Sequence, residues 1–264
     1  MPDTKHKNPK QTRTPDRTDN LLHGGSRELT CPKCHTFRNK KVGGQLIHGI
    51  PELPDSPKLR EAVGRVRDAL QAAPPADMGD DKNAFMVGVL EARVSGKDYC
   101  LVASSGRPKS WVEKRHLSNI SYRQGSWEIV HPRIPEADQK DRKWDIDWKT
   151  VAGEKINIPI PQGRDQAGRK AVDRINAPCA AMKLLLGLRE KVAQQGKWGR
   201  VEYVRMSEQV YVRNGVKVPE NMRKYQGKGK DGSYSGTWTA QSCDACTLRI
   251  PYLICDVPDN LLPG

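Results

Sequence analysis

The chain has 264 residues, a formal net charge of +14 at pH 7 and a hydrophobic content of 36%. This composition allows a small apolar core beneath a large polar surface, and no apolar run is long enough to span a membrane. The charged N-terminal residues lack the apolar stretch of a secretory signal peptide, so we expect a protein of the cytoplasm or one delivered into a target cell.

Composition along the chain predicts three parts. Residues 1–25 are rich in Lys, Thr, Asp and Pro and are typical of a disordered basic tail. Residues 26–80 form an accessory region that contains a C-x-x-C pair and one helix. Residues 84–264 form the main domain, which carries a large polar insertion at about 105–165.

Hydrophobic periodicity predicts the elements of these parts. A helix covers residues 57–73, with Ser56 as its N-cap, and apolar runs at 84–90 and 99–103 form a hairpin. A longer helix begins at Pro178. A strand then covers 201–205, with 210–212 continuing it or pairing with it, and a short helix covers 247–255. This order predicts an α/β fold, with a mixed sheet flanked by helices.

Two pairs of cysteines have the C-x-x-C spacing that lets two thiolates reach one metal ion from a tight turn. They are Cys31 with Cys34, and Cys243 with Cys246. The total of seven cysteines is odd, which argues against a simple disulfide framework. The two pairs could also share one four-cysteine zinc ribbon, or the second pair could be a redox motif.

The first pair needs two further ligands to form a structural zinc site. His35 and His48 are the candidates, and His23 is a third imidazole nearby in sequence. Cys100 and Cys255 are assigned to the apolar core, where free cysteines are common.

Cys179 stands at the predicted start of one helix, and Cys243 and Cys246 stand at the start of another. A helix N-terminus favours a thiolate, and two adjacent helices could direct three thiolates at one zinc ion. The fourth position would then remain for water, as in catalytic zinc sites. The alternative is that Cys179 is a small core residue.

The run Ala177-Pro178-Cys179-Ala180-Ala181, followed by Ser242-Cys243-Asp244-Ala245-Cys246, resembles the signature of the zinc-dependent cytidine deaminase superfamily, in particular its bacterial toxin-type nucleic-acid deaminases. The hairpin that ends in Ala103-Ser104-Ser105-Gly106 is similar to the strand pair that opens that fold. The resemblance spans roughly residues 84–257. It implies a cytidine-deaminase-like fold, a catalytic zinc on Cys179, Cys243 and Cys246, and hydrolytic deamination of cytosine to uracil in nucleic acid.

The chain departs from the signature at Ala181, where the resemblance implies the Glu that moves protons. One interpretation is an engineered Glu-to-Ala change that leaves an otherwise intact deaminase inactive, and this interpretation is preferred because the surrounding motif is complete. The other is a naturally dead relative, which would be a zinc-containing protein that binds nucleic acid without catalysis.

The expected partner is nucleic acid, because Lys and Arg neutralise phosphates. Single-stranded DNA is expected ahead of RNA. Trp238 and Tyr203 are candidates for stacking on a base, and Arg200, Lys228 and Lys230 for following the phosphate backbone. If the protein is a toxin, an immunity or inhibitor protein is a further expected partner. No membrane partner is expected.

Overall fold

The computed structural model describes residues 22–78, 83–106, 110–118, 120, 127–132, 149–156, 158, 179–194, 201–223, 239–240 and 242–258. Residues 1–21 of the tail predicted for residues 1–25, and the larger part of the predicted insertion, lie outside these residues. Within the described residues, no helix combines the length and the apolar character that crossing a membrane requires.

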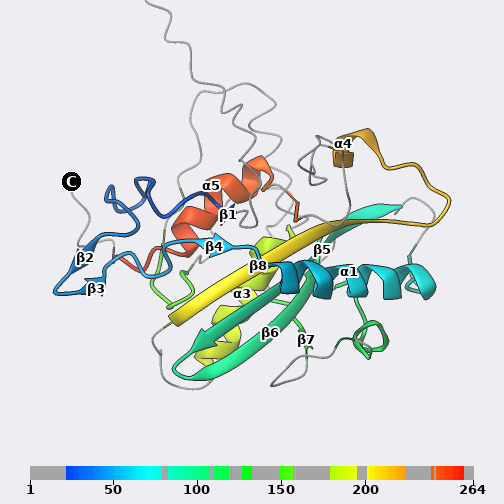
Figure 1. Ribbon diagram of the computed structural model, residues 1–264, viewed down its shortest axis with the longest axis horizontal. Helices are drawn as coiled ribbons and strands as arrows, with labels where there is room; N and C mark the ends of the chain where they lie inside the picture. Colours follow the sequence, from blue (N-terminus) through cyan, green and yellow to red (C-terminus); the bar gives the residue numbers. More distant parts are fainter. Residues whose placement is uncertain are drawn as a thin grey trace, which may run out of the picture.

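A four-stranded mixed sheet forms the centre of the molecule (Figure 1). Its strands are β5 (Ala84–Val94), β6 (Lys97–Ser104), β7 (Glu128–Ile129) and β8 (Val201–Val212), in the order β7-β6-β5-β8. β5 runs antiparallel to both β6 and β8, whereas β6 and β7 are parallel. The predicted mixed sheet is therefore confirmed, and β8 is a single strand rather than two short ones.

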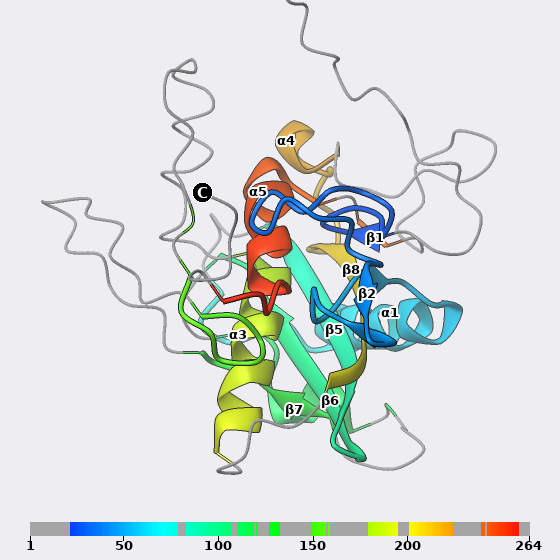
Figure 2. The same ribbon diagram turned by 90° about the vertical axis from the view of Figure 1, so that its left-hand side faces the viewer.

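Helices cover both faces of this sheet, as Figure 2 shows. α1 (Pro57–Ala72) lies on one face, and α3 (Ala180–Ala193) and α5 (Asp244–Leu253) lie on the other. α4 (Glu220–Arg223) and the 3-10 helix η1 (Lys114–Leu117) are single turns. The predicted helix at 57–73 is confirmed, and the Ser56 hydroxyl caps it by accepting from the Leu59 N–H at 3.3 Å.

The alternation of strand side chains divides the buried apolar residues into two cores. Leu90, Ala92 and Met206 face α3 and α5, whereas Phe85 and Tyr211 face α1. Phe85 stacks on Tyr211 with ring centroids 4.6 Å apart. α5 packs against α3 on this side of the sheet, and the N-termini of the two helices lie close together, which positions the site described below.

The hairpin of β5 and β6 forms where the sequence predicts it. Ser95 and Gly96 join the strands with φ angles of 49° and 77°. Two successive left-handed residues match the right-handed twist of the flanking strands. The register pairs Val94 with Lys97 across this turn.

The N-terminal region is part of the same fold. β1 (Leu22–His23) pairs with β4 (Leu53–Pro54), and a small hairpin joins β2 (Lys41–Val42) to β3 (Gln45–Leu46). Residues 22–25, assigned from sequence to the tail, therefore belong to the folded part. β4 also contacts β8, and a bridge pairs Gly49 with Cys255, so the accessory region packs directly on the main domain.

Candidate metal centres

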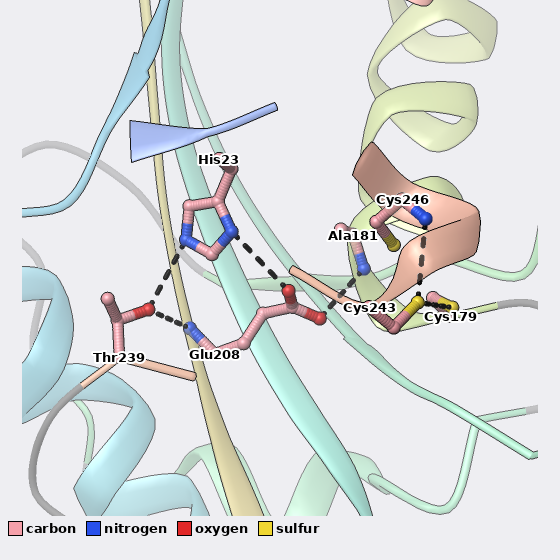
Figure 3. Close-up of polar contacts among 7 residues, drawn as sticks. All are labelled: His23, Cys179, Ala181, Glu208, Thr239, Cys243 and Cys246. Carbon is pink, nitrogen blue, oxygen red and sulfur yellow. Dashed lines mark hydrogen bonds and ion pairs between the residues drawn. The ribbon is translucent and has the colours of Figure 1, made fainter. Parts of the chain in front are cut away.

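The first group of metal-binding side chains consists of Cys179, Cys243 and Cys246, which we call the three-thiol cluster. Cys179 is the N-cap of α3 and Cys243 is the N-cap of α5, so the two helix starts bring the sulfurs together (Figure 3). The Cys179 and Cys243 sulfurs lie 3.2 Å apart, and all three sulfurs lie within 4.8 Å of one another. A tetrahedral zinc with Zn–S bonds of about 2.3 Å places its sulfurs roughly 3.8 Å apart. The three sulfurs are grouped on this scale, and the Cys179–Cys243 pair is closer than that spacing.

The three-thiol cluster offers three metal-binding donors among the described residues. Cys179 and Cys243 are half-buried and Cys246 is buried. Among the residues that the structure describes, no fourth Cys, His, Asp or Glu donor joins the group. A site with three protein ligands leaves one coordination position for another molecule.

The electrostatics of the three-thiol cluster require a cation if the sulfurs are to ionise together. Hydrogen bonding with Cys243 raises the pKa of Cys179, and burial adds to this effect. Hydrogen bonding with Cys179 and Cys243, and then burial, raises the pKa of Cys246. A bound metal ion reverses this preference, because a coordinating thiol is deprotonated. The buried guanidinium of Arg249 interacts electrostatically with all three sulfurs.

Glu208 brings a buried carboxylate from β8 to the start of α3 (Figure 3). Its Oε1 accepts a hydrogen bond from the Ala181 backbone N–H at 3.0 Å. Its Oε2 lies 3.6 Å from Nδ1 of His23. Burial, and then the charge of Cys243, raises the pKa of Glu208 to about 8.

His23 and Thr239 lie on the other side of Glu208. The Glu208 backbone N–H donates to the Thr239 hydroxyl at 2.9 Å, and this hydroxyl lies 3.3 Å from Nε2 of His23. All three side chains are buried, and burial lowers the pKa of His23 to about 4, so the imidazole is neutral at pH 7. The carboxylate thus lies between a neutral imidazole and a helix N-terminus, and its hydrogen bond is to the helix N-terminus.

The second group consists of Cys31, Cys34, His48 and Cys255, which we call the four-donor cluster. All four residues are buried and their donor atoms lie within 4.8 Å of one another. Nδ1 of His48 lies 3.1 Å from the Ile50 carbonyl oxygen, whereas its buried Nε2 has no hydrogen-bond partner among the described residues. A proton on Nδ1 leaves the Nε2 lone pair for a metal ion, which is the usual arrangement of a ligating histidine.

The local chain around Cys31 forms the predicted cysteine turn. The Cys31 N–H donates to the Thr36 carbonyl at 2.8 Å, and the His35 N–H donates to the Cys31 carbonyl at 2.9 Å. The Lys33 N–H donates to the Cys31 sulfur at 3.3 Å. A hydrogen bond with Cys255 lowers the pKa of Cys31 to about 3. The contact with Cys255, more than the turn itself, thus favours a thiolate at Cys31.

The structure corrects three interpretations of the cysteines and histidines. His35 is exposed and is not part of the four-donor cluster. Cys255 is not simply a core residue, because it completes that cluster from the segment just after α5. The single four-cysteine ribbon is wrong, since the two C-x-x-C pairs belong to different clusters.

Most of the residues proposed to contact nucleic acid lie outside the part of the chain that the structure describes. Trp238, Arg200, Lys228 and Lys230 are not among the described residues. Tyr203 lies on the α1 face of the sheet, opposite to the face that carries Glu208, because the two differ in strand phase. Its hydroxyl donates to Glu91 at 3.2 Å, and the Arg205 guanidinium lies over its ring. Tyr203 is therefore not positioned to stack on a base at the three-thiol cluster.

Sequence reasoning missed Glu208, although β8 carries a signal for it. Val204, Met206 and Val210 share one strand phase and are buried, and Glu208 stands in the same phase. A charged residue in the inward phase of an apolar strand is costly to bury unless it serves a purpose. Cys255 carried only a weak signal, since nothing local distinguishes it from a core cysteine.

Comparison with protein-family models, curated proteins and solved structures finds no match to this chain.

Proposed function

We propose that this protein is a zinc-dependent deaminase that hydrolyses cytosine to uracil in nucleic acid, with single-stranded DNA favoured over RNA. The observation that carries the proposal is the three-thiol cluster at the N-termini of α3 and α5, with one side left without a ligand among the described residues. The resemblance of the two helix starts to the deaminase signature supports the same reaction.

Zinc suits the donors of both clusters, because thiolate and imidazole are its preferred ligands in proteins. Cys179, Cys243 and Cys246 would hold the ion where its chemistry is used. When bound there, zinc would supply an activated water for attack on C4 of cytosine. The four-donor cluster has a full set of protein ligands, which suits a structural ion.

Nucleic acid is the favoured substrate because the chain carries 45 Lys and Arg against 31 Asp and Glu. Such an excess raises the affinity for phosphate backbones and makes binding sensitive to salt. A base inside a duplex is inaccessible to an enclosed site, and single strands avoid the cost of unstacking and unpairing.

The test is zinc analysis combined with a deamination assay on the full chain. We expect two zinc ions per chain and uracil formed from a cytosine-containing single-stranded DNA by the Ala181→Glu variant or by the unmodified chain, with less product from RNA and from duplex DNA. Raising the salt concentration should weaken substrate binding steeply. Zinc and DNA binding without any product, from the unmodified chain and from its Ala181→Glu variant alike, would contradict the proposal and favour a binding protein without catalysis.

A further inference from the structure

We infer that Glu208 is the proton-carrying carboxylate of the reaction, replacing from a strand the Glu that is missing from the helix at position 181. This inference rests on the proposed function. It changes the interpretation of Ala181, because a deaminase that holds its carboxylate on β8 needs none on α3. The chain as given would then be active rather than inactivated.

The first argument is the contact between Glu208 and the start of α3. Oε1 accepts from the Ala181 N–H at 3.0 Å, so the carboxylate reaches the backbone position where the signature carries its Glu. Ala181 is fully buried, so any side chain at this position is enclosed by the protein. A second carboxylate at position 181 would be buried close to the first, which repulsion and desolvation disfavour.

The second argument is that the neighbouring strand has no side chain at the position beside Glu208. Gly88 on β5 is paired with Glu208 in the sheet register. A Cβ atom at Gly88 would lie 3.2 Å from Cγ of Glu208 and 2.9 Å from Cδ1 of Leu184. Glycine therefore lets the strand, the helix and the carboxylate side chain approach each other closely.

The third argument is the way the carboxylate is held. The Thr239 hydroxyl accepts from the Glu208 N–H, so its own proton is available for Nε2 of His23. The ring proton then resides on Nδ1, 3.6 Å from Oε2 of Glu208. Nδ1 makes no hydrogen bond at this distance, so the neutral imidazole lies beside Glu208 without neutralising its carboxylate by a full positive charge. This leaves Glu208 able to accept and return a proton.

Glu208 is also outside the set of metal donors. Its carboxylate does not lie within the three-thiol cluster, although it interacts electrostatically with Cys179 and Cys243. In zinc deaminases the carboxylate that moves protons is not a zinc ligand. The position of Glu208, near the sulfurs but not among them, fits that role.

The proposed proton transfers balance as follows. Water adds its oxygen to C4 of cytosine while one of its protons passes to the Glu208 carboxylate and then to ring nitrogen N3. The second water proton passes through the same carboxylate to the amino nitrogen, and the C4–N4 bond breaks with its electron pair on nitrogen. Uracil and ammonia leave, and Glu208 returns to its carboxylate form.

The central variant is Glu208→Gln in the full chain, with Glu91→Gln as the matched control. Glu91 is also a buried glutamate of the sheet, but it lies on the α1 face and bonds to Tyr203. We expect Glu208→Gln to lower the deamination rate by about 10²–10⁴-fold and Glu91→Gln to leave it unchanged. The binding of single-stranded DNA, followed by fluorescence anisotropy, should be the same for both variants.

Cobalt(II) substitution provides a readout that is independent of activity. If Glu208 is not a ligand, the thiolate-to-cobalt absorption bands of Glu208→Gln will match those of the unmodified chain. Altered bands, or zinc lost in parallel with activity, would identify a ligand or a structural support and overturn the inference. A deamination rate within about threefold of the unmodified chain would overturn it as well.

The double variant Ala181→Glu/Glu208→Ala returns the carboxylate to the helix and separates the two proposals. We expect it to regain part of the activity that Glu208→Gln loses, and Ala181→Glu alone to be less active than the unmodified chain. If the unmodified chain is inactive and the double variant is active, the deaminase assignment stands and the role of Glu208 fails. If neither forms uracil, the proposed function itself fails.

Discussion

The two clusters of the molecule use similar donors in different surroundings. The four-donor cluster combines Cys31 and Cys34 from one turn with His48 and Cys255, and all four residues are buried. The three-thiol cluster joins two helix N-termini, and two of its cysteines are half-buried. A complete and buried ligand set suits a structural ion, whereas an incomplete set near the surface suits an ion that meets substrate.

The surroundings differ in what lies beside the sulfurs. The three-thiol cluster has the Glu208 carboxylate within electrostatic reach, hydrogen-bonded to the Ala181 N–H and adjacent to His23. The four-donor cluster joins the N-terminal region to the segment after α5, through the Gly49–Cys255 bridge as well as the donors. The first arrangement positions a reactive group, and the second fastens together parts of the chain that are distant in sequence.

The largest expected effect is on the thermal stability of the protein, which should depend more on the four-donor cluster than on the three-thiol cluster. Cys255→Ser removes a ligand that links the N-terminal region to the main domain, and structural zinc sites contribute strongly to folding. We expect one zinc fewer per chain and a Tm lowered by more than roughly 10 °C. The matched variant Cys243→Ser should also lose one zinc and abolish deamination, but lower Tm by less than roughly 5 °C.

Zinc analysis and thermal unfolding monitored by circular dichroism provide this comparison. Equal Tm losses for the two variants would show that the three-thiol cluster is structural as well. A single zinc ion in the unmodified chain would contradict the assignment of two separate sites.

The contrast between the clusters also explains what the sequence could predict. Cys31, Cys34, Cys243 and Cys246 are recognisable because C-x-x-C spacing is a local pattern. The helix with Leu59, Val63 and Val66 on its buried face, and the β5–β6 hairpin, follow from periodicity and turn residues.

The remainder depends on contacts between distant segments. Glu208 reaches Ala181 only because β8 lies beside β5 and α3 packs on the same face. Cys255 reaches Cys31 only because the end of α5 lies against the N-terminal turn. His35, adjacent to Cys34 in sequence, points elsewhere with a left-handed φ of 53°, whereas the more distant His48 is a donor.

A smaller effect concerns the charge beside each cluster. Three thiolates and one Zn²⁺ carry a net charge of −1, and one buried guanidinium interacts with each cluster: Arg249 with the three-thiol cluster and Arg38 with the four-donor cluster. We expect Arg249→Met to weaken zinc binding at the three-thiol cluster by about 10–100-fold, in line with the loss of other groups that support metal ligands.

Arg38→Met is the matched control for this experiment. Competition with a chromophoric chelator should show a lower zinc affinity only at the four-donor cluster, and deamination should be retained when zinc is in excess. Arg38 also donates to the carbonyl of Gly24 at 2.9 Å, so a lower Tm is expected for this variant as well. If Arg249→Met lowered the zinc affinity of both clusters equally, the two clusters would not be electrostatically separate.

The smallest effect tests a single hydrogen bond at the four-donor cluster. The Thr36 hydroxyl lies 3.1 Å from the Cys34 sulfur, and Thr36→Val removes this contact while keeping the shape of the side chain. Because one hydrogen bond contributes about 0.5–1.5 kcal/mol, zinc affinity at that cluster should fall by about 2–10-fold. Chelator competition measures the change, and the deamination rate should remain the same. A slower reaction would mean that Cys34 and its surroundings influence the three-thiol cluster. The distinction between a structural four-donor cluster and a catalytic three-thiol cluster would then fail.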